Sequence, residues 1–183
     1  MFSQRWRSVE TLPNFGAFGQ MGVARDPKRT LQIMTRNVKE ALRNRRVIEI
    51  AAAIVSDLKP RDYAGGLRAI DAFLRTHFKF VRDPFGQELL RRPEYLLHRM
   101  QTQGLVQGDC DDVAQLAAVL GMAIGYPAEF VAVSFDPLAK HYSHVFTVLR
   151  LPNGQGVHFD VTRPEQFANK QPPFTGGYSF PVM

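Results

Sequence analysis

The sequence predicts a mixed α+β fold in which helices come first and an antiparallel sheet follows. Up to about residue 124, apolar residues recur at spacings of three and four, which is the period of one helix face. After this region come three β-like runs, over residues 128–135, 143–151 and 156–162. With 183 residues, the chain is long enough for one domain with a sizeable core and short for two.

Start and stop signals set the expected helices. Pro27 follows Asp26, and Asp is a good N-cap while Pro is favoured at the first helical position. Asp62 can cap a later helix, and Gly125 can end the last one. We expect helices from residue 27, over 47–58, from 62 to about 77, over 93–100 and from 110 to about 124. The last two β-like runs flank Asn153-Gly154, a strong hairpin signal.

These elements suggest three regions along the chain. Residues 1–25 are rich in glycine and aromatic residues without a period, which indicates an extended N-terminal arm. Residues 26–165 are expected to form a single domain, with a helical part over 26–100 and the catalytic core over 101–165. Residues 166–183 contain three prolines and a Gly-Gly pair, so we expect an irregular C-terminal tail.

Positive charge is concentrated in the N-terminal third. Residues 1–60 contain 11 Lys/Arg and 5 Asp/Glu, a net +6, whereas residues 61–183 contain 12 of each. This region and the tail could bind a protein partner in an assembly. Nucleic acid is a lesser alternative, because residues 28–46 have few interleaved aromatics and no recognisable motif. The simplest interpretation is a solvated helix face.

Several classes of protein are excluded or disfavoured. No apolar run approaches the roughly 20 residues that a membrane-spanning helix needs, so no membrane partner is expected. Arg5 and Arg7 are not followed by an apolar stretch, so we expect no signal peptide and a cytoplasmic location. The single cysteine, Cys110, excludes an intramolecular disulfide and a zinc ribbon built from one chain.

Cys110 is the candidate nucleophile. It stands at the start of a predicted helix, where unpaired backbone N–H groups and the helix dipole favour a thiolate. Asp109, Asp111 and Asp112 adjoin it and would oppose a thiolate, although acids in a first turn are also ordinary capping residues. A base must therefore come from elsewhere in the chain. The alternative is a small buried thiol.

A thiol nucleophile needs an imidazole, and the imidazole needs a third group to orient it. His144 lies on one predicted strand of the hairpin and Asp160 on the next. A turn centred on Asn153-Gly154 would place His144 opposite a residue near 163, so Asp160 is close but out of register unless the loop is longer or a bulge intervenes. His141 and His158 are competing candidates for the base.

Four blocks resemble the transglutaminase-like branch of the papain-like cysteine enzymes, over roughly residues 65–165. They are Gly108-Asp109-Cys110-Asp111-Asp112, Gly125-Tyr126-Pro127-Ala128, His144-Val145-Phe146 and Phe159-Asp160-Val161-Thr162. Residues 78–84 resemble the segment that precedes this core. One departure is Phe146, where a Trp is common in the family.

The resemblance implies a Cys-bearing helix packed on an antiparallel sheet, with Cys110, His144 and Asp160 as a catalytic triad. It also implies cysteine-dependent amide hydrolysis, as in peptidases, or acyl transfer, through a thioester formed with a protein or peptide substrate. Gln103 or Gln107, with the N–H of Cys110, are candidate oxyanion donors. Similar small members of this family occur in bacteria and tailed phages. By analogy with the phage members, the resemblance also suggests a virion-associated role. The alternative function is a non-catalytic assembly protein that binds partners through its N-terminal region and tails.

A metal site is the rival chemistry. A zinc or calcium ion could be bound by five candidate ligands: Asp109, Asp111, Asp112, His141 and His144. Their spacing matches no HExxH helix and no EF-hand loop. We therefore expect neither a metal nor a cofactor.

Overall fold

The structure is a computed structural model that describes residues 2–13, 18–21, 27–84, 89–135, 138, 142–162 and 176–182, with residues 18–21 described as backbone. The helices are a 3-10 helix η1 (Arg5–Ser8), α1 (Pro27–Ala41), α2 (Arg45–Ile54), α3 (Tyr63–His77), α4 (Pro93–Gln103) and α5 (Cys110–Ala123). The strands are β1 (Phe18–Met21), β2 (Phe78–Phe80), β3 (Leu89–Arg91), β4 (Val106–Gly108), β5 (Ala128–Ser134), β6 (His144–Arg150), β7 (Gly156–Phe159) and β8 (Gly176–Val182).

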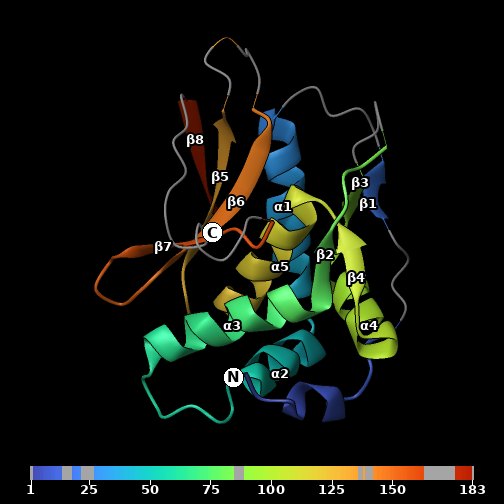
Figure 1. The fold of residues 1–183 in the computed structure, drawn as a ribbon, viewed down its shortest axis with the longest axis vertical. Coiled ribbons are helices and arrows are strands. Elements are labelled where there is room, and N and C mark those ends of the chain that lie inside the picture. Colours follow the sequence, from blue (N-terminus) through green and yellow to red (C-terminus); the bar gives the residue numbers. More distant parts are fainter. Residues whose placement is uncertain are drawn as a thin grey trace.

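The α+β prediction is confirmed. A four-stranded antiparallel sheet in the order β7-β6-β5-β8 packs against α5, with α1, α2 and α3 around that helix (Figure 1). Two short pairs complete the fold, antiparallel β1–β3 and parallel β2–β4. Parallel β2 and β4 are joined by residues that include α4, as parallel pairs require a long connection.

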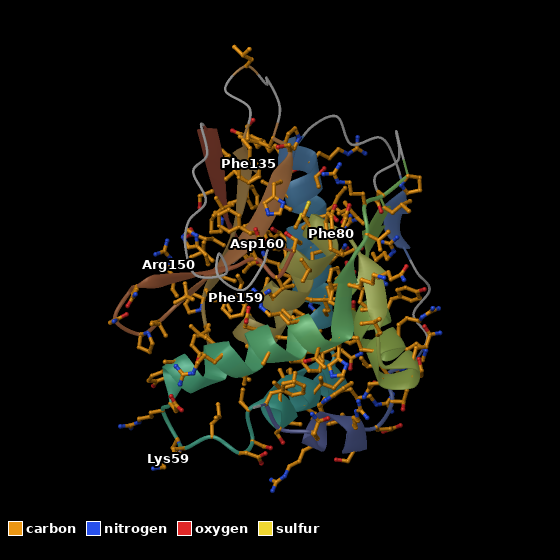
Figure 2. The ribbon with its side chains drawn as sticks, in the orientation of Figure 1. Lys59, Phe80, Phe135, Arg150, Phe159 and Asp160 are labelled. Atoms are coloured by element: carbon orange, nitrogen blue, oxygen red, sulfur yellow. The ribbon has the colours of Figure 1, made fainter. Side chains whose placement is uncertain are left out.

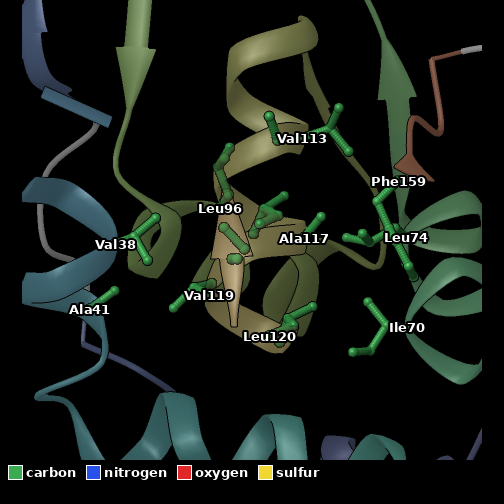
Figure 3. Close-up of a cluster of buried hydrophobic side chains, with 14 of the residues drawn as sticks. Val38, Ala41, Ile70, Leu74, Leu96, Val113, Ala117, Val119, Leu120 and Phe159 are labelled. Atoms are coloured by element: carbon green, nitrogen blue, oxygen red, sulfur yellow. The ribbon is translucent and has the colours of Figure 1, made fainter. Parts of the chain in front are cut away.

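Helix α5 is the centre of the core, and almost all of it is buried. Apolar residues from α1, α3 and α4 surround it, among them Val38, Ile70, Leu74 and Leu96 (Figure 3). On the sheet side, the Thr147 hydroxyl of β6 donates a 2.7 Å hydrogen bond to the Ala114 carbonyl. This bond joins helix and sheet close to the start of α5, and so fixes the position of Cys110 relative to β6.

Most of the predicted helix limits hold, because their signals are local. The Asp62 side chain accepts a 2.8 Å hydrogen bond from the N–H of Gly65, as a capping residue should. Helix α2 differs: it begins at Arg45 and ends at Ile54, earlier than the predicted 47–58. Asn44 caps it by accepting from the N–H of Arg46, and this cap lies ahead of the apolar pattern used for the prediction. Asp26 lies outside the described residues.

The expected extended arm is wrong for residues 2–13. Phe2, Trp6 and Leu12 are buried in the core, and Trp6 is 1% exposed. Its ring packs edge-on against Phe73 at 4.9 Å between centroids, and also contacts His77. Phe2 and Trp6 pack on Phe73 near the end of α3, and the backbone of Leu12 bonds to His98 and Gln101 of α4, contacts that no local periodicity reveals.

The expected irregular tail is wrong for residues 176–182. They form β8, which pairs with β5 along seven residues, from Ala128↔Val182 to Ser134↔Gly176. Pro181 is tolerated because β8 is an edge strand, where one side of the backbone needs no donor. Residues 163–175 lie outside the described chain. The alternative function assumed free ends that order on a partner, and that premise does not hold for these two described segments.

Among the described residues, no helix combines the length and apolarity needed to cross a bilayer.

Candidate active site

Cys110 and His144 line the same cavity, which has a volume of about 740 Å³. Its walls come from the start of α1, from β2, from the first turn of α5 and from the start of β6. Aromatic side chains stand at its rim, with Phe80 on β2 and Phe135 just after β5 (Figure 2). The cavity is open to solvent and large enough to admit part of a peptide.

Cys110 is the first residue of α5 and is half-buried. Asp109 before it is extended (φ −109°, ψ −159°), so the chain changes from strand to helix at the cysteine itself. The first turn of a helix presents backbone N–H groups without intrahelical partners, and the sulfur therefore lies at the positive end of the helix dipole. This placement agrees with the helix start expected at residue 110.

His144 and Asp160 meet directly. The Nε2 atom of His144 lies 2.7 Å from Oδ2 of Asp160, and their side chains are 11% and 5% exposed. The other oxygen of Asp160 accepts two hydrogen bonds from Thr162, one from its N–H at 3.2 Å and one from its hydroxyl at 2.5 Å. Both carboxylate oxygens are thus engaged, which fixes the ring of His144. Asp160 lies behind the ring rather than in the cavity wall.

The hairpin register explains how this contact forms. Thr147 pairs with Phe159 and Arg150 with Gly156, so continuing the ladder would place residue 162 opposite His144. Asp160 is therefore out of register, as expected. No bulge closes the gap: β7 ends at Phe159, and the Asp160 carboxylate reaches His144 from the segment that follows the strand.

The carboxylates beside Cys110 are neutralised inside the protein. Asp112 is fully buried and accepts hydrogen bonds from the guanidinium and, at 3.1 Å, from the N–H of Arg91 on β3. Burial raises the pKa of Asp112 to about 7, while Arg91 opposes that rise. Whether paired as an anion or protonated, Asp112 adds little net negative charge near the thiol.

Asp111 is neutralised differently. Its residue is 2% exposed, and neither of its oxygens has a hydrogen-bond donor among the described residues. Burial raises its pKa well above the usual range, and neighbouring Asp109 adds to the effect. Asp111 therefore favours the protonated form, which can share its proton with Asp109. Two of the three acids that appeared to oppose a thiolate are thus neutralised within the fold.

We expect Asp111→Asn to be more stable than the wild type at neutral and alkaline pH. Because the folded-state pKa of Asp111 is raised, the native state holds a proton that the unfolded state loses above about pH 4, so wild-type stability falls as pH rises. Each pH unit in that window costs up to about 1.4 kcal/mol, or roughly 3–5 °C in Tm at this chain length. Asparagine has no such proton to lose.

Thermal melts at pH 4.5 and 7.5 measure this effect. The difference in Tm between Asp111→Asn and the wild type should grow by about 5 °C or more between the two pH values. Asp71→Asn is a matched control, because Asp71 is a half-buried carboxylate already paired with Arg75. A difference in Tm that stays constant with pH would show that Asp111 is ionised in the fold.

Among the described residues, Asp109, Asp111 and Asp112 are the group whose candidate ligand oxygens converge, within 4.8 Å of one another. Arg91 already forms an ion pair with Asp112, and the raised pKa of Asp111 favours its protonated form. Two of the three acids are thus neutralised by groups of the chain itself.

Gly108 is required by close approach. A Cβ atom at this position would lie 2.3 Å from Oδ2 of Asp112. The glycine therefore lets β4 pass against the buried carboxylate that Arg91 holds. This gives a physical reason for the glycine at the start of the Gly-Asp-Cys-Asp-Asp block.

Two functional residues were missed by the sequence analysis. Thr162 had a local signal, since Asp-x-Thr favours a turn in which the aspartate accepts from the residue two positions later. Arg91 had none, because its partner Asp112 is 21 residues away on another element.

Other candidates are not in the cavity. Gln103 and Gln107, named as oxyanion donors, are exposed and do not line it. His158 stacks on Phe146 with 5.2 Å between ring centroids and is also absent from the cavity wall, and burial lowers its pKa. His141 lies outside the described residues.

Comparison with known proteins gives one informative match. No protein-family model matches the chain, and no curated protein matches it. Among solved structures, the fold is similar to that of a putative protease from Parabacteroides distasonis, with a TM-score of 0.50 and 15% sequence identity. The match covers 70% of this chain and 26% of that one, so the chain spans about a quarter of the length of its structural relative. At this identity the likeness concerns the fold.

Proposed function

We propose that the protein is a cysteine-dependent amide hydrolase or acyl transferase of the transglutaminase-like type, acting on a protein or peptide substrate. The observation that carries this proposal is the His144–Asp160 hydrogen bond of 2.7 Å, with His144 and Cys110 in the wall of one cavity. The fold likeness to a structure described as a protease is compatible with it.

The chemistry follows from which ring nitrogen of His144 is hydrogen-bonded to Asp160. Because Nε2 of His144 is bound to Asp160, Nδ1 is the nitrogen that can accept the thiol proton of Cys110. The thiolate then attacks the substrate carbonyl carbon, the C–N bond breaks, and the imidazolium returns the proton to the leaving amine. A thioester to Cys110 remains.

The second half-reaction restores the enzyme. Water attacks the thioester while His144 removes its proton, and the acid and the free thiol are released. A primary amine in place of water would give acyl transfer instead. Hydrolysis is the simpler outcome, because it needs one substrate site and solvent, and the cavity is open to solvent.

Labelling of Cys110 by a thiol-directed acyl-epoxide, followed by intact mass spectrometry, tests the proposal. The wild type should gain one label, Cys110→Ala none, and His144→Ala should react at least about 100-fold more slowly, because the base is missing. His158→Ala is the matched control, as His158 neighbours Asp160 in sequence but does not line the cavity. Equal labelling rates in the two histidine variants would refute the role of His144.

A further inference from the structure

Helix α1 has two different faces. Leu31 and Met34 line the catalytic cavity. About 180° around the helix, at roughly 100° per residue, lie Arg29, Arg36 and Arg43, spaced seven residues apart, the last just beyond the end of α1. Lys39 falls between them, and all four side chains are exposed. We call these four residues the basic stripe.

The cations of the basic stripe have no partners among the described residues. Elsewhere in the described chain most arginines are paired with acids, for example Arg46 with Glu10, Arg75 with Asp71 and Arg150 with Glu129. The one acid on α1 is Glu40, and it already forms an ion pair with Arg92 at the N-terminus of α4. Within the described residues, the stripe is therefore a line of positive charge without an ion pair.

The stripe has a regular geometry. At 1.5 Å per step, the 14 steps from Arg29 to Arg43 would span about 21 Å if the helical rise continued past Ala41, where α1 ends. Two shallow hollows, of about 440 and 330 Å³, lie between its side chains, and Glu40, which pairs with Arg92, also lines the smaller one. We propose that the basic stripe binds the backbone phosphates of a nucleic-acid duplex, without reading its sequence.

Surface chemistry favours a phosphate backbone over a protein. The central part of a protein interface is apolar and depleted of charge, whereas backbone binding needs only cations and polar donors. None of the exposed large hydrophobic side chains of the described residues belongs to α1, and Ile33 is 8% exposed. Gln32, an exposed amide donor, lies beside the basic stripe in the same hollow as Arg29 and Arg36.

The absence of exposed aromatic side chains on α1 favours a duplex over a single strand. Proteins that hold single strands stack the bases on exposed aromatic side chains, and each stacked base contributes roughly 1–3 kcal/mol. Of the exposed aromatics in the described residues, Phe80, Phe135 and Tyr142 line the catalytic cavity, and the other two, Tyr63 and Tyr178, also lie outside α1. Cations that recur along one helix face suit a duplex backbone, whose phosphate charges also recur regularly along its axis.

Binding at the basic stripe is expected to be independent of catalysis, because the stripe and the cavity occupy opposite faces of α1. Fluorescence anisotropy with a 20-base-pair labelled DNA duplex, titrated at several salt concentrations, measures it. Arg29→Ala/Arg36→Ala/Arg43→Ala should weaken binding at least tenfold and reduce the salt slope by about two to three, since each phosphate contact contributes about 0.9.

Three controls make the result specific. Lys59→Ala/Arg68→Ala/Lys79→Ala removes the same charge from exposed positions outside α1 and should leave most binding intact. The corresponding triple Lys variant of the stripe should retain most affinity. Cys110→Ala should bind the duplex like the wild type, and the triple Ala variant should still be labelled at Cys110.

Other outcomes would overturn the proposal. Equal losses in the two Ala triples would mean that net charge alone attracts DNA. Tighter binding of a poly-glutamate peptide than of the duplex would assign the stripe to an acidic protein, and preference for the single strand of the same sequence would exclude duplex binding.

Discussion

Asp160→Asn is expected to slow alkylation of Cys110 by about 10³-fold or more while leaving the fold intact. The reason lies in the two donors of Thr162, which require an oxygen at the Oδ1 position. An asparagine must then turn its NH₂ group toward Nε2 of His144. Nε2 becomes an acceptor, the ring proton moves to Nδ1, and Nδ1 can no longer take the thiol proton. In serine proteases, the same kind of tautomer error lowers kcat about 10⁴-fold.

Measuring the second-order alkylation rate constant, with a thermal melt alongside, checks this result. Asp160→Asn/Thr162→Val should recover part of the rate, because losing the hydroxyl donor lets the amide rotate. Thr162→Val alone should cause a smaller loss. If Asp160→Asn reacted within tenfold of the wild type, the orienting role of Asp160 would be wrong.

Arg91→Ala is expected to destabilise the protein by about 3–5 kcal/mol, because Asp112 then keeps a buried carboxylate without its cation. That corresponds to a fall in Tm of roughly 10 °C or more for a chain of this size. Loss of Arg91 also removes an influence that lowers the pKa of Asp112. Below about pH 7, where the pKa of wild-type Asp112 lies, both native states hold this proton, so the additional loss caused by the higher pKa in Arg91→Ala should grow as pH rises above about 7.

Chemical denaturation at pH 5 and pH 8 tests this prediction. Arg150→Ala is the matched control, because Arg150 and Glu129 form an ion pair on the surface that is worth less than about 1 kcal/mol. Arg91→Ala/Asp112→Asn should be more stable than Arg91→Ala, since no buried charge remains. Similar losses for Arg91→Ala and Arg150→Ala would mean that Asp112 is not ionised in the fold.

Short-range patterns explain which elements could be predicted. The start of α3 follows from Asp62 as a cap and the end of α5 from Gly125, and each signal lies within two residues of the helix end that it sets. Strands β3 and β4 could not be predicted, because each has three residues and depends on a partner elsewhere in the chain. Strand β8 is as long as β5 and β6, but it contains a Gly-Gly pair and Pro181, and it forms only by pairing with distant β5. The burial of Trp6 against Phe73 is a long-range contact of the same kind.

The sequence by itself determined that a lone cysteine begins a helix and that a histidine lies on one strand of a hairpin, because helix starts and turns are encoded locally. It placed Asp160 on the second strand, over 156–162, but that strand ends at Phe159. Only the tertiary structure decided which groups meet. It brings Asp160 to Nε2 of His144 from beyond the end of β7, adds Thr162 behind it, and places Arg91 on Asp112. These contacts depend on where separate segments end and how they pack against one another. The order of residues along the chain carries no direct information about the distance in space between such segments.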